Sequence, residues 1–443
     1  MSEHSHWKKI LLGLVLTMLC WSPSRAQQEP PSTPDDSTSS KQVDSSPTVP
    51  LQLEVRPAGR TSPLLSYDSF LRWGPIFVRT VQFLQNYDQI HPVSGTGQGI
   101  FNQNGYMSSV FYSDIVFDKQ FRQSRLEIQY SPRLAIVNGN VSSNFLNQNA
   151  NLNWIQQLSP RWTLGVNPSV IYMQVRQLYG EFFLGANSIT ATTLPNSFLD
   201  GPGSWLTSNL ETTLAYALSP TSSVSVAPFF GYSHLGGVVN GLQSSSIYQY
   251  GGKVGLDKRL SPTRGIYGNY YARFVGDIGS GILYQSGEIG YGQKFGPSTD
   301  VAVSGGLLTV GFARRQWDVS GSVQLSRKLG RSNAAVGYYR GFPLFSETAT
   351  QGVAQRVDAS YRLDLSQRWY SQVHGGYEDT LGSNATNFSG KYIAAEFGYN
   401  LNPRWSCFVT YAYKTQSGTD PGLFGGSRDF YSGGIRWSAL PIQ

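Results

Sequence analysis

Charged residues in this sequence recur at alternate positions within short segments, with opposite signs two residues apart. Arg125 and Glu127 form one such pair, and Arg356 and Asp358 form another. Residues two apart lie on the same face of an extended strand, so these segments predict strands with one face that carries both signs of charge. Such a face can hold ion pairs between neighbouring strands, and it can contact polar solutes.

Residues for covalent or metal chemistry are sparse. Nucleophilic catalysis needs a base beside the nucleophile; His234 follows Ser233, and His374 lies near Ser371, but no motif surrounds either histidine. No paired spacing of histidines or carboxylates matches a metal site. We expect no enzyme activity, no metal and no cofactor, and a lipase or protease remains the least favoured alternative.

The composition excludes several classes of protein. Only 14% of the 443 residues are charged, against roughly 25% in soluble domains. No segment after residue 26 approaches the 18 apolar residues of a spanning helix, which excludes a helical membrane protein. The formal charge is +7. Basic runs with interleaved aromatic residues are absent, so we expect no nucleic-acid partner.

The first residues have the pattern of an export signal. Two lysines precede an apolar run from Ile10 to Cys20, and small residues lie at the end of the stretch. We predict a signal peptide over residues 1–26. Its removal leaves 31 − 26 = +5 charges and one cysteine, Cys407, which cannot form an internal disulfide. Residues 27–66 are rich in Pro, Ser and Asp and predict a disordered leader, and residues 67–443 form the folded part.

The folded part consists of segments of roughly 10 to 14 residues with period-two alternation, which is typical of strands with one apolar face. Residues 125–136, 162–172 and 356–365 show it most clearly. The corner LSPRW at 158–162 has close relatives at 218, 260, 295 and 401, and LGRSN at 329 and LSQRW at 365 keep its frame without proline. Proline presets a turn, and Ser or Asn can bond the local backbone, so each copy predicts a tight hairpin.

We predict eighteen strands, the first over 73–84, the fourth over 150–158 and the last over 428–437, with sixteen as the alternative. Tight turns alternate with longer polar links. An open sheet of this size would have exposed edges, and its polar faces carry too little charge for a soluble sandwich. Closure into a barrel satisfies every backbone group within a bilayer. The predicted fold is therefore all-β, a closed antiparallel transmembrane β-barrel.

These features resemble bacterial outer-membrane β-barrel proteins of the porin type. The resemblance covers about 370 residues and rests on pattern. It implies an outer-membrane location, with the short turns on the periplasmic side and the longer loops on the extracellular side. The partners it implies are outer-membrane lipid and the barrel-assembly machinery, and it allows a homo-oligomer. In such families the last strand carries an assembly signal, which here corresponds to Tyr431, Ile435 and Trp437, although SALPIQ follows that tryptophan. Aromatic residues expected at the membrane interfaces are Trp162, Trp369, Trp405, Tyr172, Tyr232, Tyr377 and Tyr413, with Tyr339 also toward the long links.

Charge should be confined to the inner face, because Arg or Lys at the middle of a lipid-facing strand costs roughly 2 to 4 kcal/mol. The pore-lining candidates are Arg125, Glu127, Arg133, Glu211, Lys253, Asp257, Glu288, Asp318, Arg356, Asp358, Arg362, Asp364 and Glu396. Any one of them can equally be half of a structural cross-strand pair. The longest link, at about 174–204, is the constriction candidate through Glu181 and Asp200, and a cap over the mouth is its alternative.

The sequence therefore predicts a porin-like channel for passive diffusion of small hydrophilic solutes, without strong ion selectivity. The second hypothesis is an outer-membrane barrel with a structural, adhesion or polysaccharide-export role and no open general pore.

Overall fold

The structure is a computed structural model, and it describes residues 72–92, 106–138, 145–174, 204–236, 245–277, 280–311, 316–341, 352–382, 388–418 and 426–439. All of them belong to one compact unit, Ser46–Gln443. The predicted signal peptide and leader lie outside the described residues. Within the described ranges, no helix is long and apolar enough to cross a membrane.

The described residues form a single antiparallel sheet of 19 strands. The first, β1, is a two-residue bridge (Arg72–Trp73) beside β2. The others are β2 (Ile76–Pro92), β3 (Tyr106–Gln120), β4 (Ser124–Asn138), β5 (Phe145–Gln157), β6 (Trp162–Gln174), β7 (Ser204–Ser219), β8 (Ser222–Gly236), β9 (Ser245–Ser261), β10 (Arg264–Asp277), β11 (Ser280–Phe295), β12 (Thr299–Val310), β13 (Gln316–Leu329), β14 (Ser332–Gly341), β15 (Gly352–Asp364), β16 (Trp369–Gly382), β17 (Phe388–Asn400), β18 (Trp405–Gly418) and β19 (Gly426–Ser438).

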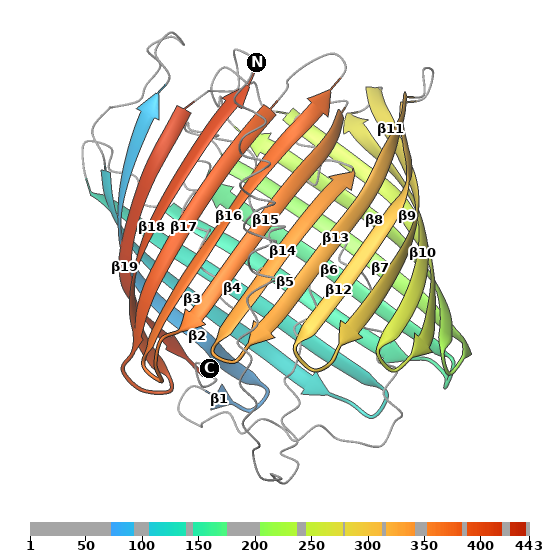
Figure 1. Ribbon diagram of the computed structural model, residues 1–443, viewed down its shortest axis with the longest axis horizontal. Helices are drawn as coiled ribbons and strands as arrows, with labels where there is room; N and C mark the ends of the chain where they lie inside the picture. The colour runs from blue at the N-terminus through green and yellow to red at the C-terminus, as the bar shows by residue number, and fades with distance from the viewer. Residues whose placement is uncertain are drawn as a thin grey trace, which may run out of the picture. The chain divides into compact units, whose positions relative to one another are not determined.

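The sheet closes on itself. Each strand from β2 to β19 pairs with its neighbours in the sequence, and β19 pairs with β2 over thirteen positions, from Gly426 with Pro92 to Ser438 with Thr80. Figure 1 shows these strands tilted around one barrel, with the tight turns together at one end. The predicted closed barrel is confirmed, and among the described residues it has eighteen strands, β2 to β19.

Strand boundaries differ from expectation mainly at the end away from the tight turns. The first barrel strand spans Ile76–Pro92 rather than 73–84, and β5 begins at Phe145 rather than 150. Both extensions consist largely of polar residues, so apolar alternation fades before backbone pairing does. In β5, Asn147, Asn149 and Asn151 alternate with a weakly apolar face, which hides the strand in a hydropathy pattern.

The tight turns are built as the recurring motif predicts. In LSPRW, the Ser159 hydroxyl accepts hydrogen bonds from the backbone N–H groups of Arg161 and Trp162, at 3.3 and 3.1 Å. In LNPRW, the Asn402 side-chain oxygen accepts the equivalent pair at 2.8 and 2.9 Å. The LGRSN copy has no proline and instead has Gly330 at a φ of 54°, a left-handed conformation that glycine adopts at little cost.

The two faces of each strand differ in exposure. Along β4, Ile128, Leu134 and Ile136 are at least 36% exposed, whereas Arg133 and Ala135 between them are buried. Across the sheet, the buried Leu84, Val110, Ala135 and Phe408 pack as one apolar cluster. Side chains on the concave face of a closed sheet converge, so we assign the buried face to the inside and the exposed apolar face to the outside.

Candidate functional site

The backbone register carries this assignment from strand to strand. Directly paired residues lie on the same face, and Leu134 of β4 pairs with Leu146 of β5 while Arg133 pairs with Asn147. Both leucines are exposed, whereas Arg133 and Asn147 are each 3% exposed. Followed around the barrel, the register defines one continuous inner wall and one continuous outer surface.

All thirteen charged residues selected from the sequence lie on this inner wall by register. They are Arg125, Glu127 and Arg133 on β4, Glu211 on β7, Lys253 and Asp257 on β9, Glu288 on β11, Asp318 on β13, Arg356, Asp358, Arg362 and Asp364 on β15, and Glu396 on β17. Their pore-lining role stays a prediction. The constriction candidates Glu181 and Asp200 lie outside the described residues.

Several wall charges form ion pairs within one strand, two residues apart. Arg125 lies 3.3 Å from Glu127, Arg356 lies 2.7 Å from Asp358, and Arg362 lies 3.1 Å from Asp364. The alternating charges in the sequence are therefore partners of each other. A face that pairs its own charges has a small net field, and the expected weak ion selectivity stays a prediction.

One chain of contacts crosses five strands near the tight-turn end of the wall. The Arg362 guanidinium lies over the Tyr370 ring, 4.7 Å from its centroid, and the Tyr370 hydroxyl donates to Glu396 at 2.8 Å. Glu396 also lies 3.5 Å from Arg436 on β19, whose guanidinium covers the Phe408 ring of β18 at 4.5 Å. Glu396, Tyr370 and Phe408 are buried, and the two arginines are partly buried; these five residues are called the Glu396 layer hereafter.

Glycines allow the tyrosine rings to lie flat on the wall. Gly398 pairs with Tyr370, and a Cβ on Gly398 would overlap the Tyr370 ring. A second tyrosine, Tyr392 of β17, crosses over Gly376 of β16 in the same way, and its hydroxyl donates to Asp358 of β15 at 3.0 Å. Each tyrosine ring thus lies over a glycine of the neighbouring strand, and its hydroxyl holds a carboxylate in place.

A second polar cluster lies on β2 to β4, and its members were not among the residues predicted from the sequence. The Arg79 guanidinium makes a short ion pair with Asp114, and the Ser131 hydroxyl donates to the same carboxylate at 3.1 Å. Asp114 is 3% exposed. Alternation with the outward Phe111 and Ile115 could have found Asp114, but the register shift between Val78 and Thr80 displaces Arg79 from the pattern.

The wall of β7 to β11 carries more widely spaced charges. Here the structure adds Arg273 of β10, which is 8% exposed and donates to Gln249 of β9. Glu288 accepts a long hydrogen bond from the Ser304 hydroxyl at 3.5 Å. Arg273 alternates with the outward Phe274, so the same rule that selected Lys253 would have selected it.

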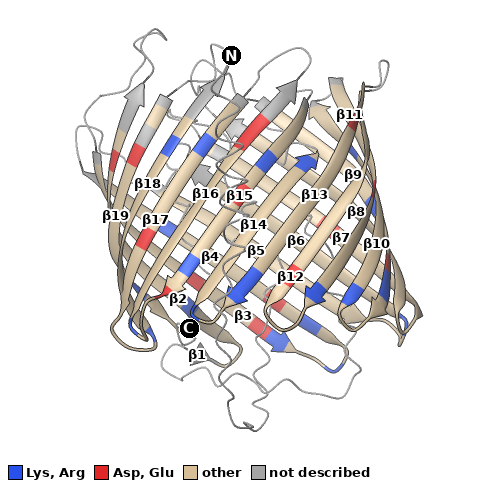
Figure 2. Ribbon diagram, viewed as in Figure 1, with Lys and Arg blue, Asp and Glu red and all other residues tan. Residues whose placement is uncertain are grey.

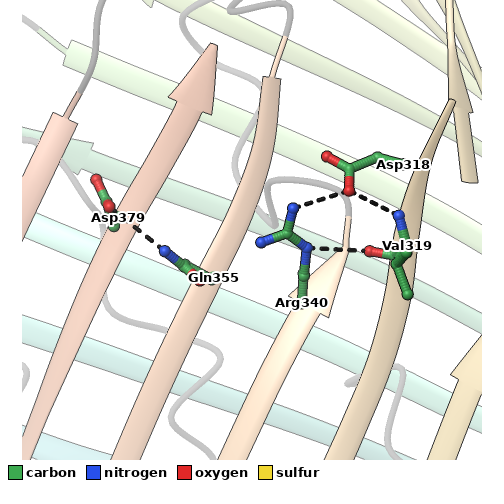
Figure 3. Close-up of polar contacts among 5 residues, drawn as sticks. All are labelled: Asp318, Val319, Arg340, Gln355 and Asp379. Carbon is green, nitrogen blue, oxygen red and sulfur yellow. Dashed lines mark hydrogen bonds and ion pairs between the residues drawn. The ribbon is translucent and has the colours of Figure 1, made fainter. Parts of the chain in front are cut away.

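Asp318 lies near the wall's far end, and its partner is on β14. That strand ends at Gly341, and its pairing with β13 stops at Gly321 with Arg340. The Arg340 guanidinium continues the ladder, because it donates to the Val319 carbonyl at 3.2 Å and to Asp318 at 2.8 Å (Figure 3). Figure 3 also shows Gln355 beside Asp379 on the next two strands, 3.5 Å apart.

The expected interface aromatics lie on the outer surface by register. Trp162, Trp369 and Trp405 are 40%, 43% and 43% exposed. The remaining four lie nearer the other end: Tyr172, Tyr232, Tyr377 and Tyr413. Tyr339 is a correction: it pairs with Ser322 on the inner wall, and its neighbour Tyr338 faces outward beside Val323. Because positions 338 and 339 are both tyrosine, only the register tells which of the two faces outward.

The last strand, β19, presents Tyr431, Ile435 and Trp437 on the outer surface, paired with Tyr411, Cys407 and Trp405 of β18. Tyr431 and Ile435 are 47% and 46% exposed. Their role as an assembly signal stays a prediction.

The histidine pairs considered for catalysis are not brought together. His374 lies on the inner wall while Ser371 faces outward on the same strand, and His234 donates to or accepts from Ser246 at 2.9 Å on the outer surface. Among the described residues, no group of three or more His, Cys, Asp or Glu side chains could hold a metal ion.

No protein-family model matches the chain, and no curated protein matches it. Several solved structures are similar in fold. OccK9 (OpdG) of Pseudomonas aeruginosa has a TM-score of 0.44 and 9% identity, covering 82% of this chain and 98% of that one. The outer membrane protein OpdK of the same organism gives 0.41 and 10%, covering 81% and 99%.

OccAB4 of Acinetobacter baumannii gives a TM-score of 0.39 and 13% identity, covering 81% of this chain and 98% of that one. Likeness at TM-scores below 0.5 bears on neither the function nor the substrate of this chain.

Proposed function

We propose that this chain is an outer-membrane channel of the porin type, through which small hydrophilic solutes diffuse passively. The observation that carries the proposal is the separation of side chains between the two faces of a closed eighteen-strand barrel. Closure leaves no strand edge exposed to lipid, and a barrel of sixteen to eighteen strands is wide enough for an aqueous passage.

The outer surface has the layout of a lipid-facing barrel. By register, the charged residues of the described outer surface lie at strand ends: Lys119, Lys258, Arg264 and Arg327 near the tight turns, and Arg340, Asp379, Lys391 and Asp429 near the other end. Between them the surface is apolar, glycine or uncharged polar. This distribution avoids the cost of burying a charge in lipid.

The aromatic residues set a suitable height for this apolar band. Trp369 and Tyr377 on β16 are both outward and lie eight residue steps apart, or roughly 26 Å along the strand at about 3.3 Å per residue. Strand tilt shortens this to roughly 20 Å across the membrane, near the band of about 25 Å usual for outer-membrane barrels. We place the tight turns on the periplasmic side, as the resemblance implies.

The inner wall supports a hydrophilic passage of mixed charge. Acidic and basic groups alternate around it, and Figure 2 shows both signs distributed over many strands. Since ion pairs join several of the wall charges to each other, the wall favours polar solutes without strong selection for either ion sign.

The proposal is tested by the conductance of the refolded full chain in a planar bilayer. We expect discrete current steps with similar permeability to potassium and chloride. A protein that shows heat-modifiable mobility and β spectra, and therefore is folded, but gives no current steps would contradict the open pore. That result would favour the structural, adhesion or export role instead.

A further inference from the structure

Three of the tight turns end in the same Arg-Trp dipeptide and have the same internal bonds. The dipeptides are at 161–162, 368–369 and 404–405. In the middle one, the Ser366 hydroxyl accepts from the backbone N–H groups of Arg368 and Trp369 at 3.1 and 3.0 Å, as Ser159 and Asn402 do in the others. These bonds therefore fix the backbone positions from which the arginine and tryptophan side chains extend.

In two of these turns, a tyrosine on the neighbouring strand holds both side chains. Arg368 donates to the Tyr399 hydroxyl at 3.1 Å, and the Trp369 ring lies 4.5 Å from the Tyr399 ring. Arg161 and Trp162 make the same contacts with Tyr216, at 3.4 and 4.7 Å. A guanidinium is thus held next to an exposed tryptophan at the membrane boundary, with donors left over.

The turn at 365–368 also borders a groove. Its volume is about 600 Å³, and its lining residues are Arg331, Ser366, Gln367, Arg368, Trp369 and Tyr399. Both arginines are exposed, and among the described residues neither has a carboxylate partner. The acidic residue at the end of β15, Asp364, is bonded to Arg362 at 3.1 Å. The groove therefore presents two cations beside two aromatic rings.

The surrounding rim is also basic. The tight turns of the described chain contain no Asp or Glu, and their charged residues are Arg122, Arg161, Arg331, Arg368 and Arg404. Figure 2 shows Lys and Arg at several strand ends on this side of the barrel. Clustered Arg and Lys next to a membrane attract anionic lipid, so the charge of the rim and the chemistry of the groove favour the same ligand.

We infer that this groove, with its Arg331 and Arg368, binds the phosphate of an anionic phospholipid of the periplasmic leaflet. Two guanidinium forks match the oxygens of a phosphate. Trp369 and Tyr399 have amphipathic rings of the kind that lie at headgroup depth. The inference rests on the membrane insertion in the proposed function and does not require an open pore.

Lipid quenching of Trp369 tests the site in the full chain. The protein is refolded into phosphatidylcholine vesicles that contain a minor share of brominated phosphatidylglycerol, and the Trp369 signal is the difference between the wild type and Trp369→Phe. We expect stronger quenching than with the same share of brominated phosphatidylcholine. In Arg331→Gln/Arg368→Gln, this preference should fall by about 25-fold, since each of the two arginines contributes roughly a factor of five near anionic lipid.

A matched control removes two cations elsewhere on the same rim, Lys119→Gln/Arg122→Gln, and should keep the preference. Equal quenching by the two lipids in the wild type would overturn the inference, and so would an equal loss in the control pair or displacement of the lipid by inorganic phosphate. The wild-type comparison decides even where the arginine variant does not fold. Vesicle flotation separates the two proposals: a chain that does not insert contradicts both, whereas an inserted chain without lipid preference contradicts only the site.

Discussion

At the residue scale, several wall charges are held by partner side chains. The alternation of apolar and polar residues in the sequence identifies only some of these partners. The pattern found Glu396 because it lies between outward Ala395 and Phe397, but it did not select Arg436, its ion-pair partner on β19. Tyr370 was also missed, because aromatic residues were expected on the lipid side. The alternation along β16 predicts its direction, because Trp369 and Val373 face outward and position 370 therefore faces inward.

Removal of the Glu396 carboxylate tests whether this layer stabilises the barrel. Glu396→Ala would leave Arg436, whose side chain is 12% exposed, without its carboxylate, and loss of one member of a buried pair costs about 3 kcal/mol or more. Tyr370→Phe removes only a hydroxyl and should cost about 1 kcal/mol. Urea unfolding of the refolded protein, followed by tryptophan fluorescence, gives both values. An unchanged midpoint for Glu396→Ala would show that the layer contributes nothing to stability.

At the element scale, strand order and tight turns were predictable from the sequence, because each strand pairs with its neighbours in the chain and each turn carries its own residues. The far ends of β2 and β5 were not. Backbone pairing continues through polar residues such as Asn147 and Asn149, where the apolar face no longer marks the strand. The cap by Arg340 depends on the pairing of β14 with β13, which no single segment contains.

The tyrosine and glycine pairs across strands give a prediction about packing. Gly398→Ala should destabilise the barrel by about 1 to 3 kcal/mol, because the new methyl group displaces the Tyr370 ring. Gly337→Ala is the matched control, since nothing lies within 4 Å of a Cβ at that position of the wall. The urea midpoints of the two variants provide the comparison. Equal midpoints would mean that the ring does not lie over Gly398.

Arg340 gives a prediction about the end of β13. Arg340→Gln removes the donors to the Val319 carbonyl and to Asp318, so this strand end should open more often and its amides should exchange hydrogen about fivefold to tenfold faster, as expected for the loss of about 1 to 1.5 kcal/mol. Hydrogen exchange over residues 316–320 measures it. Gln355→Ala, which loses only a 3.5 Å contact with Asp379, should leave that exchange unchanged; an equal increase in both variants would refute the cap.

At the scale of the whole molecule, closure converts eighteen two-faced strands into an outer surface without charge between its ends and an inner wall of mixed charge, part of which forms ion pairs. The sequence alone predicted the closed barrel and its strand number. It could not predict which wall residues meet, since the contacts of the Glu396 layer join residues from Arg362 to Arg436. The solute that such a wall admits depends on the same pairing.

The most direct test of a conducting inner wall is current through single channels that carry one introduced cysteine. Both variants are made in a Cys407→Ser background. Ser322→Cys is on the inner wall, where the Ser322 hydroxyl lies 2.8 Å from the Ser304 hydroxyl. Val323→Cys is on the outer surface, where Val323 is 45% exposed. A charged, water-soluble thiol reagent should reduce each current step for Ser322→Cys and leave Val323→Cys unchanged. Unaltered steps for Ser322→Cys, or a reduction confined to Val323→Cys, would contradict an aqueous passage bounded by this wall.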